Sequence, residues 1–145
     1  MKIWDTVGAE RITLRSLTAN YFKNADGVIV AFDLTNYDSF LNVRDWIRCV
    51  HKHKELSFPI VLIGNKYDLC DLEQSATSYL NRQVEYDAAS ELSASYNISY
   101  FETSAKSDKN ITETMQHIFE KSHEYKMQFQ LNRRSFGLIR DRHTA

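Results

Sequence analysis

Two short polar motifs in the second half of the chain have the residue types and spacing of a purine-binding site. The NKYD motif, Asn65 to Asp68, follows the apolar run Ile60–Gly64, and the ETSAK motif, Glu102 to Lys106, follows Ser99–Phe101. The Asp68 carboxylate can accept two hydrogen bonds, from the ring N–H and the exocyclic amine of guanine, and adenine offers no such pair of donors. Because an unpaired buried carboxylate is costly, such a site rejects the wrong base.

The other residues of the two motifs have complementary roles in this interpretation. Asn65 can bond the other edge of the base and join neighbouring loops, and the backbone N–H of Ala105 can donate to the guanine carbonyl oxygen. The side-chain stems of Lys66 and Lys106 can lie along the base plane. The alternative is that both motifs are solvated turns, which Asn and Asp favour. The predicted guanine-binding residues are Asn65, Lys66, Asp68, Ser104, Ala105 and Lys106.

The hydrophobic pattern predicts the elements that position these motifs. Short apolar runs typical of buried strands alternate with longer runs whose apolar residues recur every three or four positions, as in helices. This alternation predicts βαβ crossovers and a three-layer α/β fold, in which ligands bind at the carboxyl ends of the strands. The predicted strands are 28–34, 58–64 and 98–102, and the predicted helices are 38–53, about 88–96, and a last helix that begins after Asn110.

Length and composition exclude several classes of protein. The 145 residues suffice for one domain, and 18 Lys and Arg against 19 Asp and Glu give a formal net charge of −1. A near-neutral chain has no general attraction to nucleic acid. Two cysteines, Cys49 and Cys70, exclude a disulfide scaffold, and no apolar run approaches the ~18 residues of a membrane span. We therefore expect a cytoplasmic protein without nucleic-acid partners.

With these motifs in place, the sequence resembles a Ras-superfamily small GTPase, closest to the Rab family. Residues 3–11, IWDTVGAER, are similar to the family's WDTAGQER segment, and residues 21–25, YFKNA, are similar to the Rab-typical YYRGA. The resemblance runs from about Lys2 to about Glu124. It implies a partial small GTPase domain over 1–127, from the third strand onward, and a loose C-terminal tail over 128–145. The longer stretch between the NKYD and ETSAK motifs resembles the EF-hand-bearing large Rab proteins.

The resemblance also implies the ligands and partners. Family members bind GTP or GDP with Mg²⁺, and bind effectors and exchange factors. In the matching positions, Asp5 would reach Mg²⁺ through water, and Thr6 and Gly8 would sense the γ-phosphate. Trp4 and Tyr21 would belong to a hydrophobic effector patch, although simple packing explains these aromatics equally well.

Three departures from the family pattern limit what the chain alone can do. The 145 residues contain no GxxxxGK[S/T] phosphate loop, so we expect a P-loop NTPase-like fold that lacks its first two strands, phosphate loop and first helix. Ala9 stands where the family has the glutamine that orients the attacking water, so we expect slow hydrolysis. The sequence ends in Thr144-Ala145 without a prenylation cysteine, so we expect only weak membrane association.

Two functions fit these observations. The first is a Rab-like small GTPase, a guanine-nucleotide switch in vesicle traffic, present here as an incomplete chain that alone neither binds nor hydrolyses GTP. The second is a non-enzymatic interaction protein derived from a GTPase, which would bind a partner through the face of Trp4 and Tyr21 or through its last helix. The NKYD and ETSAK motifs favour the first function, and the three departures favour the second.

We predict that the 145 residues do not fold stably by themselves. In the family, the missing first strand lies between the strand that ends at Asp5 and the strand that begins at Val28, so its absence leaves two unpaired edges, which promote aggregation. Thermal unfolding followed by circular dichroism should show no cooperative transition in plain buffer. A sharp transition from a native-like spectrum would contradict this prediction.

Overall fold

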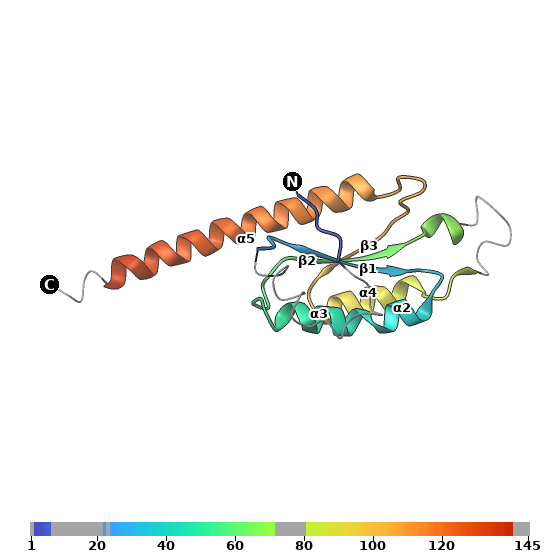
Figure 1. Cartoon of the computed structure of the whole chain (residues 1–145), viewed down its shortest axis with the longest axis horizontal. Coiled ribbons are helices and arrows are strands. Elements are labelled where there is room, and N and C mark those ends of the chain that lie inside the picture. Colours follow the sequence, from blue (N-terminus) through green and yellow to red (C-terminus); the bar gives the residue numbers. More distant parts are fainter. Residues whose placement is uncertain (1, 7–21, 23, 72–80, 141–145) are drawn as a thin grey trace.

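In the part of the chain that the structure describes, three parallel strands form the centre, and helices cover both faces of the sheet (Figure 1). The computed structural model describes residues 2–6, 22, 24–71 and 81–140, with side chains as far as 132. The strands β1 (Val28–Asp33), β2 (Ile60–Asn65) and β3 (Ser99–Glu102) lie in the order β1-β2-β3. On one face lie α2 (Tyr37–Leu41), α3 (Val43–His51) and α4 (Tyr86–Ser95), and on the other lies α5 (Ile111–Arg140). The predicted three-layer α/β arrangement is confirmed.

The strand register brings the polar ends of the strands together. β1 pairs with β2 from Val28 opposite Ile60 to Asp33 opposite Asn65. β2 pairs with β3 from Val61 opposite Ser99 to Gly64 opposite Glu102. Because all three strands run in the same direction, the residues that follow them meet at one edge of the sheet, as the sequence predicted.

The segment predicted as one helix over 38–53 forms two helices. The first, α2, ends at Leu41, and α3 begins at Val43, with Asn42 between them. Asn36 caps α2, because its side-chain oxygen accepts a hydrogen bond from the Ser39 N–H at 3.1 Å. The inner face of α3 is the predicted one, since Val43, Ile47 and Val50 are buried against the sheet.

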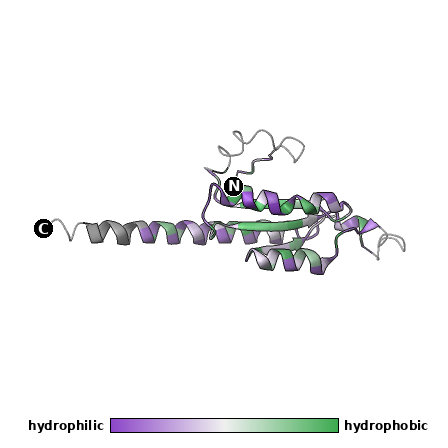
Figure 2. Cartoon of the chain, turned by 90° about the horizontal axis from the view of Figure 1, so that it is seen from below, coloured by the Kyte–Doolittle hydropathy of each residue, from purple (hydrophilic) through white to green (hydrophobic). Residues whose placement is uncertain are grey.

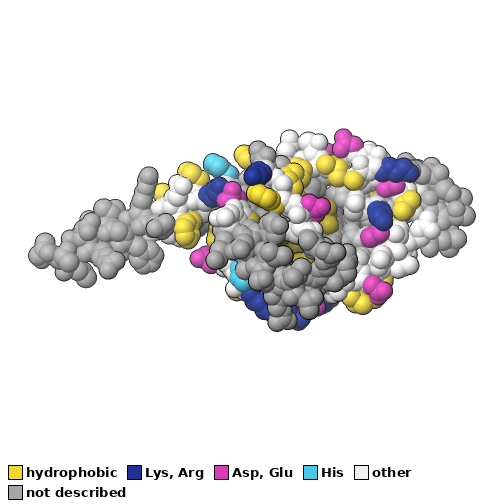
Figure 3. Space-filling model, in the orientation of Figure 1, with side chains coloured by type: hydrophobic (Ala, Val, Ile, Leu, Met, Phe, Trp, Pro, Cys, Tyr) yellow, Lys and Arg dark blue, Asp and Glu magenta, His cyan; other side chains and the backbone are white. Residues whose placement is uncertain are grey.

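The hydrophobic core lies between the sheet and the layer of α2, α3 and α4. Its largest fully buried side chains include Leu34, Ile47 and Leu62. The strands are the most hydrophobic elements, and the helices carry mixed surfaces (Figure 2). Where the face in Figure 3 is coloured, hydrophobic, basic and acidic side chains lie interspersed.

Residues 2–6 differ from the prediction that a strand ends at Asp5. In the structure they are exposed and form no strand. A strand needs a neighbour to pair its backbone N–H and C=O groups, and no strand among the described residues pairs with this segment. Within the described ranges, β1 is accordingly an edge strand of the sheet.

Helix α5 also extends further than the sequence predicted. It continues to Arg140, whereas a loose tail was expected over 128–145. Residues 128–140 contain no proline and several good helix formers, namely Gln, Leu and Arg, which explains the longer helix. Tyr125 packs edge-on against Phe58, and Lys126 forms an ion pair with Asp26 at 2.6 Å. Beyond these contacts the helix projects past the sheet (Figure 2). None of the helices in the described ranges has the length and apolar character needed to cross a membrane.

Substituting Leu34→Ala should lower the free energy of unfolding by about 2–5 kcal/mol, because the side chain is fully buried and its loss leaves a cavity. The matched control is Leu56→Ala, which removes the same atoms from a side chain that is 84% exposed and should change stability by less than about 0.5 kcal/mol. Urea unfolding in a stabilising osmolyte such as trimethylamine N-oxide measures the free energy of unfolding of both variants. Equal losses in the two variants would contradict the assignment of Leu34 to the core.

Candidate functional site

Two loops meet at the carboxyl ends of β2 and β3. We call them the NKYD loop, residues 65–70, which includes the short 3₁₀ helix η2 (Tyr67–Leu69), and the SAK loop, residues 103–110. Backbone hydrogen bonds join them, from the Thr103 N–H to the Gly64 carbonyl at 2.8 Å and from the Tyr67 N–H to the Thr103 carbonyl at 3.0 Å. These bonds continue the β2–β3 pairing beyond the sheet and place the two sequence motifs side by side.

Asp68 is the buried acid of the site, as the sequence interpretation requires. Its side chain is 7% exposed, and its Oδ1 accepts a hydrogen bond from the Ser104 hydroxyl at 2.6 Å. The other oxygen, Oδ2, lies 3.9 Å from the Lys106 ammonium, whose side chain is 80% exposed. The carboxylate is therefore held in one orientation by a buried hydroxyl, and its second oxygen faces the surface on the side of the SAK loop.

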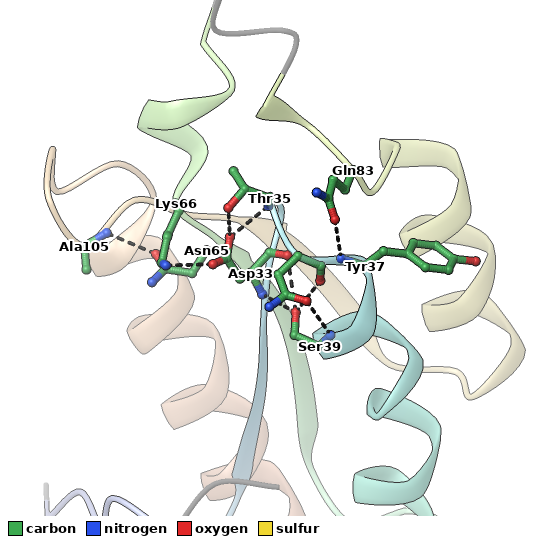
Figure 4. A network of polar contacts seen from close by, with 9 residues as sticks. Asp33, Thr35, Tyr37, Ser39, Asn65, Lys66, Gln83 and Ala105 are labelled. Atoms are coloured by element: carbon green, nitrogen blue, oxygen red, sulfur yellow. Dashed lines mark hydrogen bonds and ion pairs between the residues drawn. The ribbon is translucent and has the colours of Figure 1, made fainter. Parts of the chain in front are cut away.

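Asn65 links the two loops through its side-chain oxygen. This Oδ1 accepts a hydrogen bond from the Ala105 N–H at 3.2 Å (Figure 4). It also accepts one from the Thr103 hydroxyl at 3.3 Å. The sequence analysis assigned Asn65 a loop-joining role, and the structure places it in that role. The same analysis gave the Ala105 N–H to a guanine carbonyl, whereas here it donates to Asn65. Because Ala105 is exposed, a base could share this donor or replace Asn65.

Lys66 has an unusual backbone conformation and a defined partner. Its φ of 66° lies in the left-handed region, which is uncommon for residues other than glycine and concentrates at functional sites. Its ammonium forms an ion pair with Asp33 Oδ2 at 2.7 Å (Figure 4). The stem that was predicted to lie along the base is thus anchored at its charged end to the end of β1.

Asp33 is a site residue that the sequence analysis missed. Its Oδ1 also accepts hydrogen bonds from the Thr35 N–H at 2.8 Å and the Thr35 hydroxyl at 2.7 Å. Burial raises the pKa of this carboxyl, but hydrogen bonds from Lys66 and Thr35 outweigh burial and hold the pKa below its ordinary value. Its position as the first acid at the end of a buried apolar run was the signal that could have identified it.

A second acid–base pair fixes the end of β3. Arg82 binds Glu102 with both guanidinium arms, at 2.8 and 2.9 Å, and donates to the Val84 carbonyl at 2.9 Å. The Tyr100 hydroxyl donates to the same carboxylate at 3.1 Å. Burial and the neighbouring Glu102 charge raise the pKa of Tyr100, so this hydroxyl keeps its proton. Glu102 belongs to the ETSAK motif, but nothing in the sequence identified Arg82 as its partner.

The predicted N-terminal site residues are not brought to these loops by any described contact. Trp4, Asp5 and Thr6 are exposed, while Gly8, Ala9 and Tyr21 lie outside the described residues. Mg²⁺ in nucleotide sites is held by one or two carboxylates, substrate phosphates and water. Among the described residues, no three or more His, Cys, Asp or Glu side chains gather into a metal site. Asp5 is a single exposed carboxylate, so the described residues by themselves do not fit a resident Mg²⁺.

Comparison with known proteins identifies the family. The sequence model of the Ras family matches residues 1–124, most of the chain. The chain belongs to the Ras family. This confirms the resemblance to small GTPases on which the sequence analysis relied, and the three-stranded parallel sheet with its helices is the corresponding part of a small GTPase fold.

Its similar relatives include Rab proteins. Ras-related protein Rab-27A of Rattus norvegicus is 43% identical over 121 residues, which are 83% of this chain and 50% of the relative. GTP-binding protein ypt1 of Schizosaccharomyces pombe is 37% identical over 77% of this chain and 49% of the relative. A Ras and EF-hand domain-containing protein homolog of Mus musculus is 36% identical over 81% of this chain and 18% of the relative. The chain thus spans about half the length of the Rab-27A and ypt1 relatives that it matches.

Because of the Asp33–Lys66 pair, the free energy of unfolding should fall at low pH. Because the pKa of Asp33 is lower in the folded chain than its ordinary 3.8, its contribution to stability is full above about pH 5 and is lost as pH falls through the folded pKa. Urea unfolding in the same osmolyte measures the free energy of unfolding at pH 7 and at pH 3. The decrease between the two should be smaller in Asp33→Asn than in the parent. The control Asp45→Asn removes an acid whose exposed ion pair contributes little. An identical decrease in Asp33→Asn and in the parent would contradict the proposed stabilisation by the ionised Asp33 carboxylate.

Proposed function

We propose that this member of the Ras family is part of a Rab-like, guanine-nucleotide-binding switch, and that the NKYD and SAK loops select guanine. The observation that carries this proposal is the buried Asp68 carboxylate, held by Ser104 at 2.6 Å and directed toward the SAK loop. A carboxylate fixed in this way offers acceptors to two donors side by side. The Watson–Crick edge of guanine presents such donors at its ring N–H and exocyclic amine.

The contacts around Asp68 explain why a wrong base would bind poorly. Adenine presents an acceptor where guanine presents the ring N–H, so it would set an acceptor against the buried carboxylate, which would keep its bond from Ser104 and gain none from the base. An unsatisfied buried charged group costs more than the ~1–3 kcal/mol of a neutral one, which corresponds to a selectivity of tenfold or more. Ala105 is exposed, and its N–H, which donates to Asn65, is the group that the guanine carbonyl oxygen would share or take over.

The described residues supply only the end of the site that would hold the base. The 145 residues contain no GxxxxGK[S/T] segment, and the structure describes no phosphate-binding loop. We infer that these residues select the base and that most of the affinity for GTP or GDP would depend on phosphate and Mg²⁺ contacts outside them. A site limited to the base should bind no tighter than about millimolar, or ~4 kcal/mol. With Ala9 in place of glutamine, hydrolysis would be slow.

The cellular role follows from the family and its Rab relatives. We propose a function in vesicle traffic, in which the nucleotide state controls the binding of protein effectors and exchange factors. We also propose a cytoplasmic location. Both statements rest on the family resemblance.

A second candidate function is partner binding without catalysis. It is favoured by the exposure of Ile3 and Trp4, which are 69% and 63% accessible at the start of the described chain. The two candidates differ in what they require of the guanine loops. The first needs a selective base site, whereas the second leaves the NKYD and SAK loops without a ligand.

Guanosine monophosphate titrated into ¹⁵N-labelled chain, in trimethylamine N-oxide, should shift the amide signals of the NKYD and SAK loops with a Kd near ~1 mM. Adenosine monophosphate should bind at least tenfold more weakly. The Asp68→Asn variant should prefer xanthosine monophosphate, because the base carbonyl of xanthine replaces the guanine amine and meets the donor of the Asn amide.

The matched control is Asp45→Asn, an acid-to-amide change at an exposed helix position, which should keep the preference for guanosine monophosphate. Equal binding of the guanosine and adenosine nucleotides by the parent chain would overturn the proposed guanine site. Binding of guanosine diphosphate with Mg²⁺ at micromolar Kd or tighter would instead show that the chain itself holds the phosphates and would exclude the second candidate function.

A further inference from the structure

The SAK loop is a closed turn with Lys109 at its base. Ser104 and Lys109 form a pair of backbone hydrogen bonds, each N–H donating to the other's carbonyl at 3.1 Å. Asp108 and Asn110 have left-handed φ values of 61° and 55°, which turn the chain back sharply. Residues 105–108, which form the tip, are all exposed, whereas Ser104 is fully buried. Lys109 therefore lies on the returning limb of the loop, beside its buried anchor.

The side chain of Lys109 crosses from the SAK loop to the NKYD loop. Its ammonium lies over the ring of Tyr67, 3.2 Å from the ring centroid. Tyr67 immediately precedes Asp68, and both Tyr67 and Lys109 are half-buried. A cation over an aromatic face is attracted by the ring's negative quadrupole, and partial burial strengthens this attraction.

The other interactions between the two loops hold different parts of the SAK loop. The bonds from the NKYD side reach Thr103, Ser104 and Ala105, which lie on the outgoing limb. At the tip, Lys106 approaches Asp68 at 3.9 Å, but its side chain is 80% exposed and this pair is weak. The contact between Lys109 and Tyr67 thus ties the returning limb to the NKYD loop.

We propose that Lys109 and Tyr67 form a latch that positions the two loops for guanine recognition. The latch sets the separation between the Asp68 carboxylate and the Ala105 N–H, the two groups that would read the opposite ends of the guanine edge. This inference rests on the proposed guanine function of these loops. Lys109 and Tyr67 are positioning residues, because they act on the base through Asp68 and Ala105.

The charge of Lys109 is the testable feature of the latch. Lys109→Met keeps an unbranched side chain but removes the cation, whereas Lys109→Arg keeps a cation that can stack on the ring. Tyr67→Phe keeps the aromatic face, and Tyr67→Leu removes it. Lys52→Met is the matched control, because it makes the same change at an exposed position after α3.

Two measurements on the full chain in trimethylamine N-oxide separate positioning from folding. The first is the affinity for guanosine monophosphate relative to adenosine monophosphate, followed by amide shifts. Lys109→Met and Tyr67→Leu should weaken guanosine monophosphate binding about two- to tenfold, while Lys109→Arg, Tyr67→Phe and Lys52→Met stay near the parent. The second is amide hydrogen exchange without nucleotide, which should accelerate at Ser107 and Lys109 in Lys109→Met but not at Leu62 in β2.

The outcomes distinguish the latch from the function on which it rests. If the parent prefers guanosine monophosphate and Lys109→Met binds it equally well, the latch is wrong and the guanine site stands. If the parent shows no such preference, the proposed function fails, and so does the proposed effect of Lys109 and Tyr67 on guanine binding. Unchanged exchange at Ser107 and Lys109 in Lys109→Met would overturn the latch whatever the nucleotide result.

Discussion

The site depends on the close packing of the Leu34 and Tyr100 side chains against the backbone of β2 at Gly64. A Cβ at this position would lie 2.8 Å from both Leu34 Cδ2 and the Tyr100 hydroxyl oxygen, closer than side chains tolerate. Because Gly64 has no side chain, the Leu34 and Tyr100 side chains can pack directly against the end of β2, while the Gly64 carbonyl accepts the bond from the Thr103 N–H. A larger residue would displace these side chains, and Tyr100 donates to the Glu102 carboxylate at the start of the ETSAK motif.

The polar groups at this edge satisfy one another before any ligand is present. Asp33 is paired with Lys66 and Thr35, Glu102 with Arg82 and Tyr100, and Asp68 with Ser104. Buried polar groups are costly when unpaired, so such a network fixes the loops in one arrangement. The network also defines which hydrogen bonds a ligand must replace. A base that binds here has to match the acceptors of Asp68 and compete with Asn65 for the Ala105 N–H, which favours guanine over bases with a different donor pattern.

Much of this arrangement could be predicted from the sequence, because it is encoded locally. The three strands, the inner face of α3 and the proximity of the NKYD and ETSAK motifs follow from hydrophobic periodicity and from the rule that ligands bind at strand ends. The partners Arg82 and Asp33 could not be found in this way, since long-range pairing between charged side chains leaves no periodic signal. The break at Asn42 was missed because the apolar spacing continues across it. The helical continuation of α5 to Arg140 was missed because the segment was judged by its few apolar residues rather than by its helix propensity.

The site combines features that its family motifs predict with features that those motifs do not specify. Asn65, Asp68 and Ser104 occupy motif positions. Asp68 accepts a bond from Ser104, and Asn65 accepts one from Ala105, which explains why those residue types suit those positions. Tyr67 occupies the variable position of NKxD, and Lys109 lies outside the SAK triplet, yet their side chains meet across the two loops. The motif residues supply the groups that would contact a base. Their separation is set by the residues between and beside them, so two chains with identical motifs can differ in affinity for the same base when those neighbouring residues differ.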